Sequence, residues 1–283
     1  MNRHRAQPPA TMYGPMTEKA DKLPLTEHLE ELRTRLIRCA IAVFVGFVIA
    51  YIFKERLFDI LIDPLVRVMR QGDTLIFTGI PEAFFTYLKV SLLAGLFLAA
   101  PIIIYQFWMF VAPGLYKNER RLMIPIIVVS SLFFIGGALF GYFVVFPVGF
   151  KFLLGFASET IQPFPSMREY LSFSSKLLFA FGLVFELPIV ITFLARLGIV
   201  SVPFLKTNRK YAILIFFAGA ALLTPPDIVT QSLLAAPMIV LYEISILGAY
   251  VFGRKKPAGD AEDDKNDDEN DPETPGAKRN NEH

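Results

Sequence analysis

Residues 25–37 read Leu-Thr-Glu-His-Leu-Glu-Glu-Leu-Arg-Thr-Arg-Leu-Ile and join a charged surface to an apolar stripe. The stripe consists of leucines at helical spacing: Leu25, Leu29, Leu32 and Leu36. An uncharged run over residues 39–53 follows directly after Arg38. The pattern predicts an amphipathic helix over residues 25–38 that continues into a first membrane span at about residues 39–53.

The composition of the whole chain also indicates a membrane protein. Of its 283 residues 54% are hydrophobic, and the mean hydropathy is +0.48. The chain has a single cysteine, Cys39, which excludes an intramolecular disulfide and a cysteine metal cluster. It also lacks a P-loop, an H-E-x-x-H and a G-x-S-x-G motif. We therefore predict no enzymatic activity, no catalytic residue, no metal site and no bound cofactor.

Uncharged stretches predict an all-α membrane protein with six transmembrane helices. The predicted spans cover about residues 39–53, 88–112, 122–149, 170–195, 211–225 and 228–252. The last two form a short helical hairpin, because the run Thr224-Pro225-Pro226-Asp227 cannot continue a helix. Residues 54–83, the first outer loop, are predicted to form short surface helices that are interrupted at Asp63-Pro64.

The basic residues near the span ends predict the orientation in the membrane. Thirteen lie on the side of the N-terminus and six on the opposite side, which favours both termini in the cytoplasm. The six-span domain then covers residues 25–256. Residues 1–24 and 257–283 are predicted to be disordered tails, the second with ten acidic against three basic residues.

Carboxylates at the predicted membrane boundary are the first candidates for a binding site. Glu31 and Glu119 lie on the same predicted side, and a carboxylate suits the planar fork of a guanidinium group. From spacing alone, ordinary solvated ion pairs are the more common arrangement, Glu31 with Arg35 and Glu119 with Arg120. Glu186 lies deep in a span, where an ionisable group faces either a wet cavity or a neighbouring helix that satisfies it.

Six segments carry a resemblance to a known family. They are His28-Leu-Glu-Glu-Leu-Arg33, Ala112-Pro-Gly-Leu-Tyr-Lys-Asn-Glu-Arg-Arg121, Gly141-Tyr-Phe-Val-Val-Phe-Pro147, Tyr170-Leu-Ser-Phe173, Phe181-Gly-Leu-Val-Phe-Glu-Leu-Pro188 and Leu223-Thr-Pro-Pro-Asp227. Their order and spacing resemble TatC, the polytopic subunit of the twin-arginine (Sec-independent) protein translocase. The resemblance covers about residues 23–256 and neither tail.

The resemblance implies a function and a set of site residues. It implies a receptor and core subunit in the plasma membrane that binds twin-arginine signal peptides at its cytoplasmic face. Folded precursor proteins are then exported with the proton-motive force. Glu31 and Glu119 would be the recognition pair for the two arginines. Further residues would surround that pair: Arg33, Gln106, Phe110, Tyr116, Arg120 and Arg121.

The resemblance also implies positions away from the signal-peptide site. Pro64 of the outer loop, Glu186 of the concave bundle face and Asp227 of the last motif would be functional positions. Thr224 and Gln231 would lie on a docking surface for small single-span partner subunits of the TatA and TatB type. We also expect self-association and contact with the lipid bilayer, and no nucleic-acid partner.

A different class of function remains open from the residues alone. A proton-coupled secondary transporter of a small solute would use Glu186 and Glu243. Such transporters bind substrate near the bilayer midplane and often contain inverted repeats. The first three predicted spans do not match the last three in this way, and a transporter would give no role to carboxylates at the membrane boundary.

Overall fold

The computed structural model describes the chain as helices joined by short connections. The described residues are 25–70, 74–76, 79–111, 123–156, 164–224 and 227–253. The helices are α1 (Leu25–Ile52), α2 (Lys54–Val66), α3 (Glu82–Val111), α4 (Met123–Phe140), the π-helical η3 (Gly141–Val145), α5 (Phe146–Leu154), α6 (Met167–Phe185), α7 (Leu187–Arg196), α8 (Val202–Thr207), α9 (Arg209–Leu223) and α10 (Ile228–Phe252). Both predicted tails lie outside these residues.

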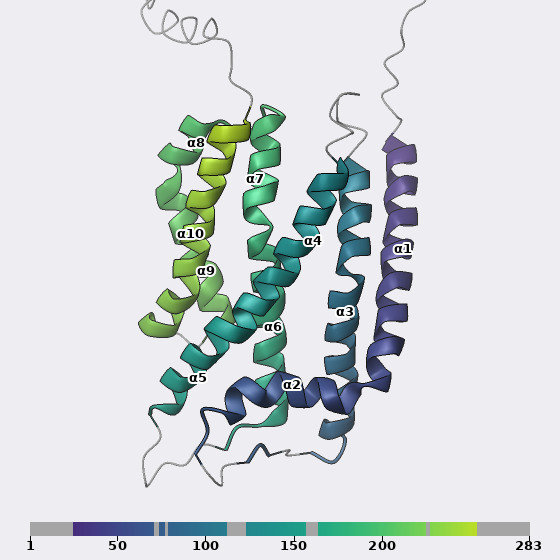
Figure 1. Ribbon diagram of the computed structural model, residues 1–283, viewed down its shortest axis with the longest axis vertical. Helices are drawn as coiled ribbons and strands as arrows, with labels where there is room; N and C mark the ends of the chain where they lie inside the picture. The colour runs from purple at the N-terminus through teal and green to yellow at the C-terminus, as the bar shows by residue number, and fades with distance from the viewer. Residues whose placement is uncertain are drawn as a thin grey trace, which may run out of the picture.

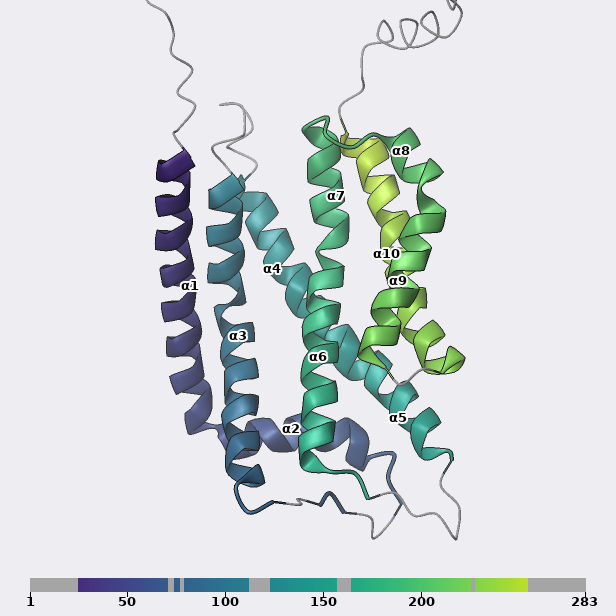
Figure 2. The same ribbon diagram turned by 180° about the vertical axis from the view of Figure 1, so that it is seen from behind.

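Five helical stretches in the described residues are long and apolar enough to cross a membrane. They are Glu27–Ile52, Glu82–Val111, Met123–Leu154, Met167–Arg196 and Ile228–Phe252. The helix α9 has only 15 residues, a rise of about 23 Å. The end of α9 and the start of α10 lie well short of the level where α6 begins and α5 ends (Figures 1 and 2). The prediction of an all-helical membrane protein with a short last hairpin is confirmed.

The helix bundle has two ends, which we name by the elements that lie there. We call the end where α1 begins the N-terminal face; α3 ends there and α4 begins there (Figure 1). The helix α2 lies across the opposite end, which we call the α2 face. The helix α1 is uninterrupted from Leu25 to Ile52, so it covers both the predicted amphipathic segment and most of the predicted first span; the point where it enters the membrane stays a prediction.

The helices α1 and α3 pack through a close contact of their backbones. A Cβ atom built on Gly46 would lie 2.5 Å from the carbonyl oxygen of Gly95. Two glycines that face each other in this way let helices in a membrane approach without a side chain between them. The pair fixes the second half of α1 against the middle of α3.

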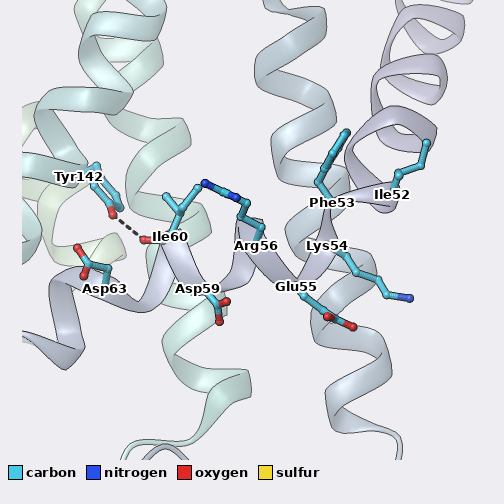
Figure 3. A pocket seen from close by; sticks show the side chains of 9 residues that line it. All are labelled: Ile52, Phe53, Lys54, Glu55, Arg56, Asp59, Ile60, Asp63 and Tyr142. Carbon is cyan, nitrogen blue, oxygen red and sulfur yellow. Dashed lines mark hydrogen bonds between the residues drawn. The ribbon is translucent and has the colours of Figure 1, made fainter.

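The first outer loop corrects a prediction. The described part of this loop contains one helix, α2, rather than several, and Pro64 lies inside it instead of ending it. A proline within a helix has no N–H for the carbonyl four residues earlier, which here is Ile60. That carbonyl accepts a hydrogen bond from the hydroxyl of Tyr142 instead, at 2.5 Å (Figure 3).

A second tyrosine fixes α2 to the bundle in the same way. The hydroxyl of Tyr170, in α6, donates to the carbonyl of Leu61 at 2.5 Å. Phe58, Leu61 and Leu65 of α2 are buried in the largest apolar core, which includes residues of η3, α5 and α6. Pro64 is itself buried in α2, and it leaves the Ile60 carbonyl free for the bond from Tyr142 that joins α2 to the third span.

The two connections on the α2 face are joined to each other. Ile76 and Ser166 form an isolated parallel bridge, in which the Met167 amide donates to the Ile76 carbonyl at 2.9 Å. The carboxylate of Glu82 accepts from the Ser166 hydroxyl at 3.1 Å and from the Arg168 amide at 2.9 Å. These contacts hold the start of α3 beside the start of α6.

Two spans depart from regular α-helix in ways that the hydrophobic pattern did not predict. The third span contains the π-helical turn η3, which carries Tyr142. The fourth span is interrupted at Glu186, between α6 and α7. Pro188 explains the interruption, because it has no N–H for the carbonyl of Val184 and its ring clashes with that carbonyl.

We expect the Tyr142 hydrogen bond to depend on Pro64. Tyr142→Phe should lower the free energy of unfolding by about 0.5–1.5 kcal/mol. The loss should be smaller in a Pro64→Ala background, because the alanine supplies an N–H to the Ile60 carbonyl. The measurement is a double-mutant cycle on thermal unfolding of the detergent-purified protein.

Tyr170→Phe is the matched control for this cycle. Its acceptor, Leu61, lies four residues before Leu65, whose N–H is present in both backgrounds. The cost of Tyr170→Phe should therefore be the same in the wild-type and in the Pro64→Ala background. Equal costs of Tyr142→Phe in the two backgrounds would contradict the role given to Pro64.

Candidate functional site

A charged cluster joins α1 to α3 near the N-terminal face. The Arg35 guanidinium donates to one oxygen of Glu31, Oε1, through Nε at 2.9 Å and Nη2 at 2.5 Å. Its third nitrogen, Nη1, donates to the side-chain oxygen of Gln106 at 3.1 Å. Arg35 therefore bridges a carboxylate on α1 and an amide on α3, and it fixes the orientation of both.

An aromatic contact completes this cluster. The imidazole of His28 stacks on the ring of Phe110, with centroids 4.3 Å apart and planes 19° apart. The Nδ1 atom of His28 lies 3.8 Å from the other oxygen of Glu31, Oε2, beyond hydrogen-bond distance. Because Arg35 binds only Oε1, Oε2 can still accept a hydrogen bond from a ligand.

The surroundings of Glu31 are acidic and open. A hollow of about 440 Å³ is lined by Glu27, Glu30, Glu31, Thr34, Arg35 and Arg38. The side chain of Glu31 is 26% exposed and that of Arg35 is 16% exposed, so both are reached from solvent only in part. Arg33 is exposed and, two residues from Glu31, lies on another side of α1.

The second predicted carboxylate lies outside the described residues. Glu119 belongs to residues 112–122, as do Tyr116, Arg120 and Arg121. The described residues on either side of this segment are Val111 and Met123, and both lie at the N-terminal face (Figure 1). The structure thus brings Glu31 together with Gln106 and Phe110, and it leaves the pairing with Glu119 untested.

Glu186 takes part in a hydrogen-bonded network between spans. Its Oε2 accepts a hydrogen bond from the Ser130 hydroxyl of α4. Ser130 in turn accepts from Nε1 of Trp108, in α3, at 3.2 Å. The other carboxylate oxygen, Oε1, is buried and has no hydrogen-bond partner in the described part of the chain. Glu186 is thus held by neighbouring helices, with one oxygen still to be satisfied.

The polar residues of the last hairpin hold the hairpin itself together. Thr224 is buried, and its hydroxyl donates to the Ala220 carbonyl at 2.9 Å. The side-chain amide of Gln231 donates to the Phe217 carbonyl at 2.8 Å, which ties α10 to α9. In this structure, therefore, both predicted docking residues bind the backbone of α9.

Asp227 is the N-cap of α10. Its carboxylate accepts from the backbone amide of Thr230 at 2.7 Å and from the Thr230 hydroxyl. These hydrogen bonds hold the pKa of the Asp227 carboxyl below its ordinary value. The cap therefore stabilises the turn at neutral pH and is lost as the pH falls through that lowered pKa.

The two acidic residues of the transporter alternative have different surroundings. Glu243 forms an ion pair with Arg209 at 2.7 Å, and both side chains are nearly half exposed. Glu186 belongs instead to the network with Ser130 and Trp108. The described residues contain no group of His, Cys, Asp and Glu that could hold a metal ion.

Some of the residues in these networks were not among the predicted site residues. The i, i+4 spacing pointed to an ion pair between Glu31 and Arg35, but not to the bond between Arg35 and Gln106. Ser130 carried no sequence signal, because small hydroxyl residues are common in membrane helices. Their roles appear only when the helices are placed side by side.

Comparisons with known proteins agree on one family. A family model described as Sec-independent protein translocase protein (TatC) matches residues 27–237. The chain is 63% identical to the protein of that name from Desulforapulum autotrophicum over 251 residues, which cover 89% of this chain and 93% of that one. The Escherichia coli K12 protein of the same name is 45% identical, over 80% of this chain and 88% of that one.

A solved structure shares the fold. It is a crystal structure described as the twin-arginine translocase receptor TatC, which matches with a TM-score of 0.73 at 42% identity. The match covers 80% of this chain and 100% of that chain. At this identity the likeness is one of sequence as well as of fold.

We expect the Glu186 network to tolerate an amide but not a hydrocarbon. Glu186→Leu removes the acceptor of the Ser130 hydroxyl and should be less stable than Glu186→Gln by about 1–3 kcal/mol. The amide oxygen of glutamine can still accept that hydrogen bond. The measurement is thermal unfolding in detergent; equal stability of the two variants would contradict the network.

Proposed function

The chain belongs to the TatC family of Sec-independent protein translocase proteins, and we propose that it is the receptor for twin-arginine signal peptides of folded precursors. The family makes it a multi-pass membrane protein of a protein-transport system and not an enzyme. Transport of proteins replaces the alternative of a small-solute transporter. The proposed receptor role rests on the Glu31 carboxylate at the N-terminal face, one oxygen of which is held by Arg35.

Glu31 is prepared to accept a second guanidinium group. Arg35 orients the carboxylate through Oε1, and the stack of His28 on Phe110 lies beside Oε2. An arginine of the signal peptide can donate to Oε2 without displacing Arg35. The neighbouring Glu27 and Glu30 make the hollow acidic, which attracts a cationic peptide.

Recognition of arginine rather than lysine follows from the geometry of the groups. A guanidinium can direct two N–H donors at the free oxygen Oε2, as Arg35 does at Oε1, whereas an ammonium is a point charge. The partial burial of Glu31 strengthens such a pair relative to one in bulk water. We propose that Glu119 binds the second arginine, with Tyr116, Arg120 and Arg121 around it, because the helix ends that flank its segment, the end of α3 and the start of α4, lie at the same face as Glu31.

The proposed location follows from the same arrangement. We propose that the N-terminal face is cytoplasmic and that the membrane is the plasma membrane, since precursors with these signals are made in the cytoplasm. Thirteen basic residues near the span ends favour this orientation against six on the opposite side. As the sequence has no nucleotide-binding motif, we propose the proton-motive force as the energy source.

We propose that small single-span partner subunits dock on the last hairpin. One side of α9 carries three exposed apolar residues: Leu214, Ile215 and Leu222. Their exposed fractions lie between 65% and 86%. In a bilayer this apolar surface meets either lipid or another helix. Gln231 would support the surface by tying α10 to α9, and Thr224 would support it by bonding the last turn of α9. A second copy of the chain is a further proposed partner.

Removing the two carboxylates should abolish recognition. In membranes that carry the Glu31→Ala/Glu119→Ala variant, crosslinking of a twin-arginine precursor should fall by at least tenfold. Each single variant should lose part of the signal. Photocrosslinking from the arginine pair of the precursor measures this directly.

Glu30→Ala is the matched control for this experiment. Glu30 is an exposed carboxylate next to Glu31 that lines the same hollow, so its loss changes the net charge by as much as the single Glu31→Ala change does. It should leave crosslinking within about twofold of wild type, because an exposed charge contributes little. Unchanged crosslinking in the double variant would remove Glu31 and Glu119 from the recognition role.

Arg35 should act as a positioning residue. Arg35→Gln removes the double contact with Oε1 and should weaken precursor binding by about fivefold to tenfold. Arg38→Gln, which removes a charge from the same hollow, should have a smaller effect. An increase in affinity for Arg35→Gln would mean that Arg35 competes with the signal peptide, contrary to this proposal.

A further inference from the structure

An apolar groove lies on the half of the bundle near the α2 face. Its volume is about 660 Å³, and residues of α1, α2, α3 and α4 line it, among them Ile49, Leu98 and Leu139. These three side chains are each about half exposed. The size is typical of a site for a small molecule, in the range of about 300–1,000 Å³. Within a bilayer such a groove has to be filled by something apolar.

A polar pocket adjoins this groove at its α2 end. The pocket has a volume of about 770 Å³, and it shares four lining residues with the groove: Phe53, Arg56, Ile60 and Tyr142. The two hollows are therefore continuous. One end is polar, and the other is almost purely apolar.

Arg56 lies where the two hollows join. Its side chain runs along the bundle side of α2 toward Ile60 (Figure 3). Among the described residues none forms an ion pair or a hydrogen bond with Arg56. The Arg56 side chain is exposed, so its guanidinium can donate hydrogen bonds to an anion that reaches the junction of the two hollows.

The carboxylates of the pocket do not neutralise Arg56. Asp63 pairs with Arg67 at 2.7 Å. Glu55 and Asp59 extend from α2 on the side away from the groove (Figure 3). The second cation, Lys54, lies over the ring of Tyr51 at 4.5 Å. The charge that faces the groove is therefore positive.

From this arrangement we propose that the groove binds a phospholipid with an anionic headgroup from the leaflet on the α2 side. An acyl chain occupies the apolar groove, and the phosphate accepts hydrogen bonds from Arg56. The planar fork of arginine matches a phosphate bidentately. A transmembrane helix fits less well, because its apolar centre brings no anion to Arg56.

Native mass spectrometry tests the proposal on the full chain in detergent with added lipid. The probes are dioleoyl phosphatidylglycerol, which is anionic, and dioleoyl phosphatidylcholine, which is not. Wild type should retain the anionic lipid about fivefold better, the effect expected of one basic residue at a membrane surface. Arg56→Gln should abolish this preference. Equal retention of the two lipids by wild type would overturn the proposal.

Two further variants separate the headgroup from the groove. Arg168→Gln removes an arginine from the same end of the bundle that lines neither the groove nor the polar pocket, and it should keep the preference. Leu98→Trp fills the groove and should lower retention of both lipids. If Arg168→Gln lost the preference as fully as Arg56→Gln, the effect would be one of net charge and the site would be wrong.

A photocrosslinker at position 98 identifies the occupant in intact membranes. The proposal predicts an adduct whose mass is that of the protein plus one phospholipid. An adduct with a polypeptide instead would assign the groove to a helix of a partner or of a second copy. That outcome would contradict the lipid site and would leave the role proposed for Glu31 untouched.

Discussion

The contact between Arg35 and Glu31 determines how the N-terminal face of this protein is built. A carboxylate at the end of a membrane helix loses part of its hydration, and an unpaired one is costly. Arg35 satisfies it from one turn further along α1 and also reaches Gln106 on α3. The same arginine that neutralises the carboxylate thus orients it, fixes α1 against α3 and leaves one oxygen for a ligand.

A similar constraint explains the α2 face. With little water at membrane depth, a backbone carbonyl without a partner has to find one within the protein. Pro64 frees the carbonyl of Ile60, and the tyrosine of the π-helical turn occupies it. The kinked fourth span follows the same rule, since Glu186 lies at its break and receives the Ser130 hydroxyl. At both Ile60 and Glu186, a departure from regular helix geometry is thus accompanied by a hydrogen bond from a hydroxyl side chain of another helix.

The sequence was sufficient to predict the all-helical membrane fold and the family, because long uncharged runs and six ordered motifs are local features. It was not sufficient for α2, where Pro64 was expected to end a helix and is instead accommodated by Tyr142, which lies 82 positions from the Ile60 carbonyl that it binds. The partners of Glu31 illustrate the same limit. Arg35 is four residues away and could be predicted, whereas Gln106 is 71 residues from Arg35 and depends on the Gly46–Gly95 contact that sets α1 beside α3.

The central claim is that Glu31 binds a guanidinium group of the signal peptide directly. A double-mutant cycle measures that interaction: binding free energies of Arg-Arg and Gln-Gln signal peptides to wild type and to Glu31→Gln. If the claim is right, the coupling energy should be about 1–3 kcal/mol, as for charge pairs in close contact. A coupling energy of zero, with both peptides weakened equally by Glu31→Gln, would contradict the account.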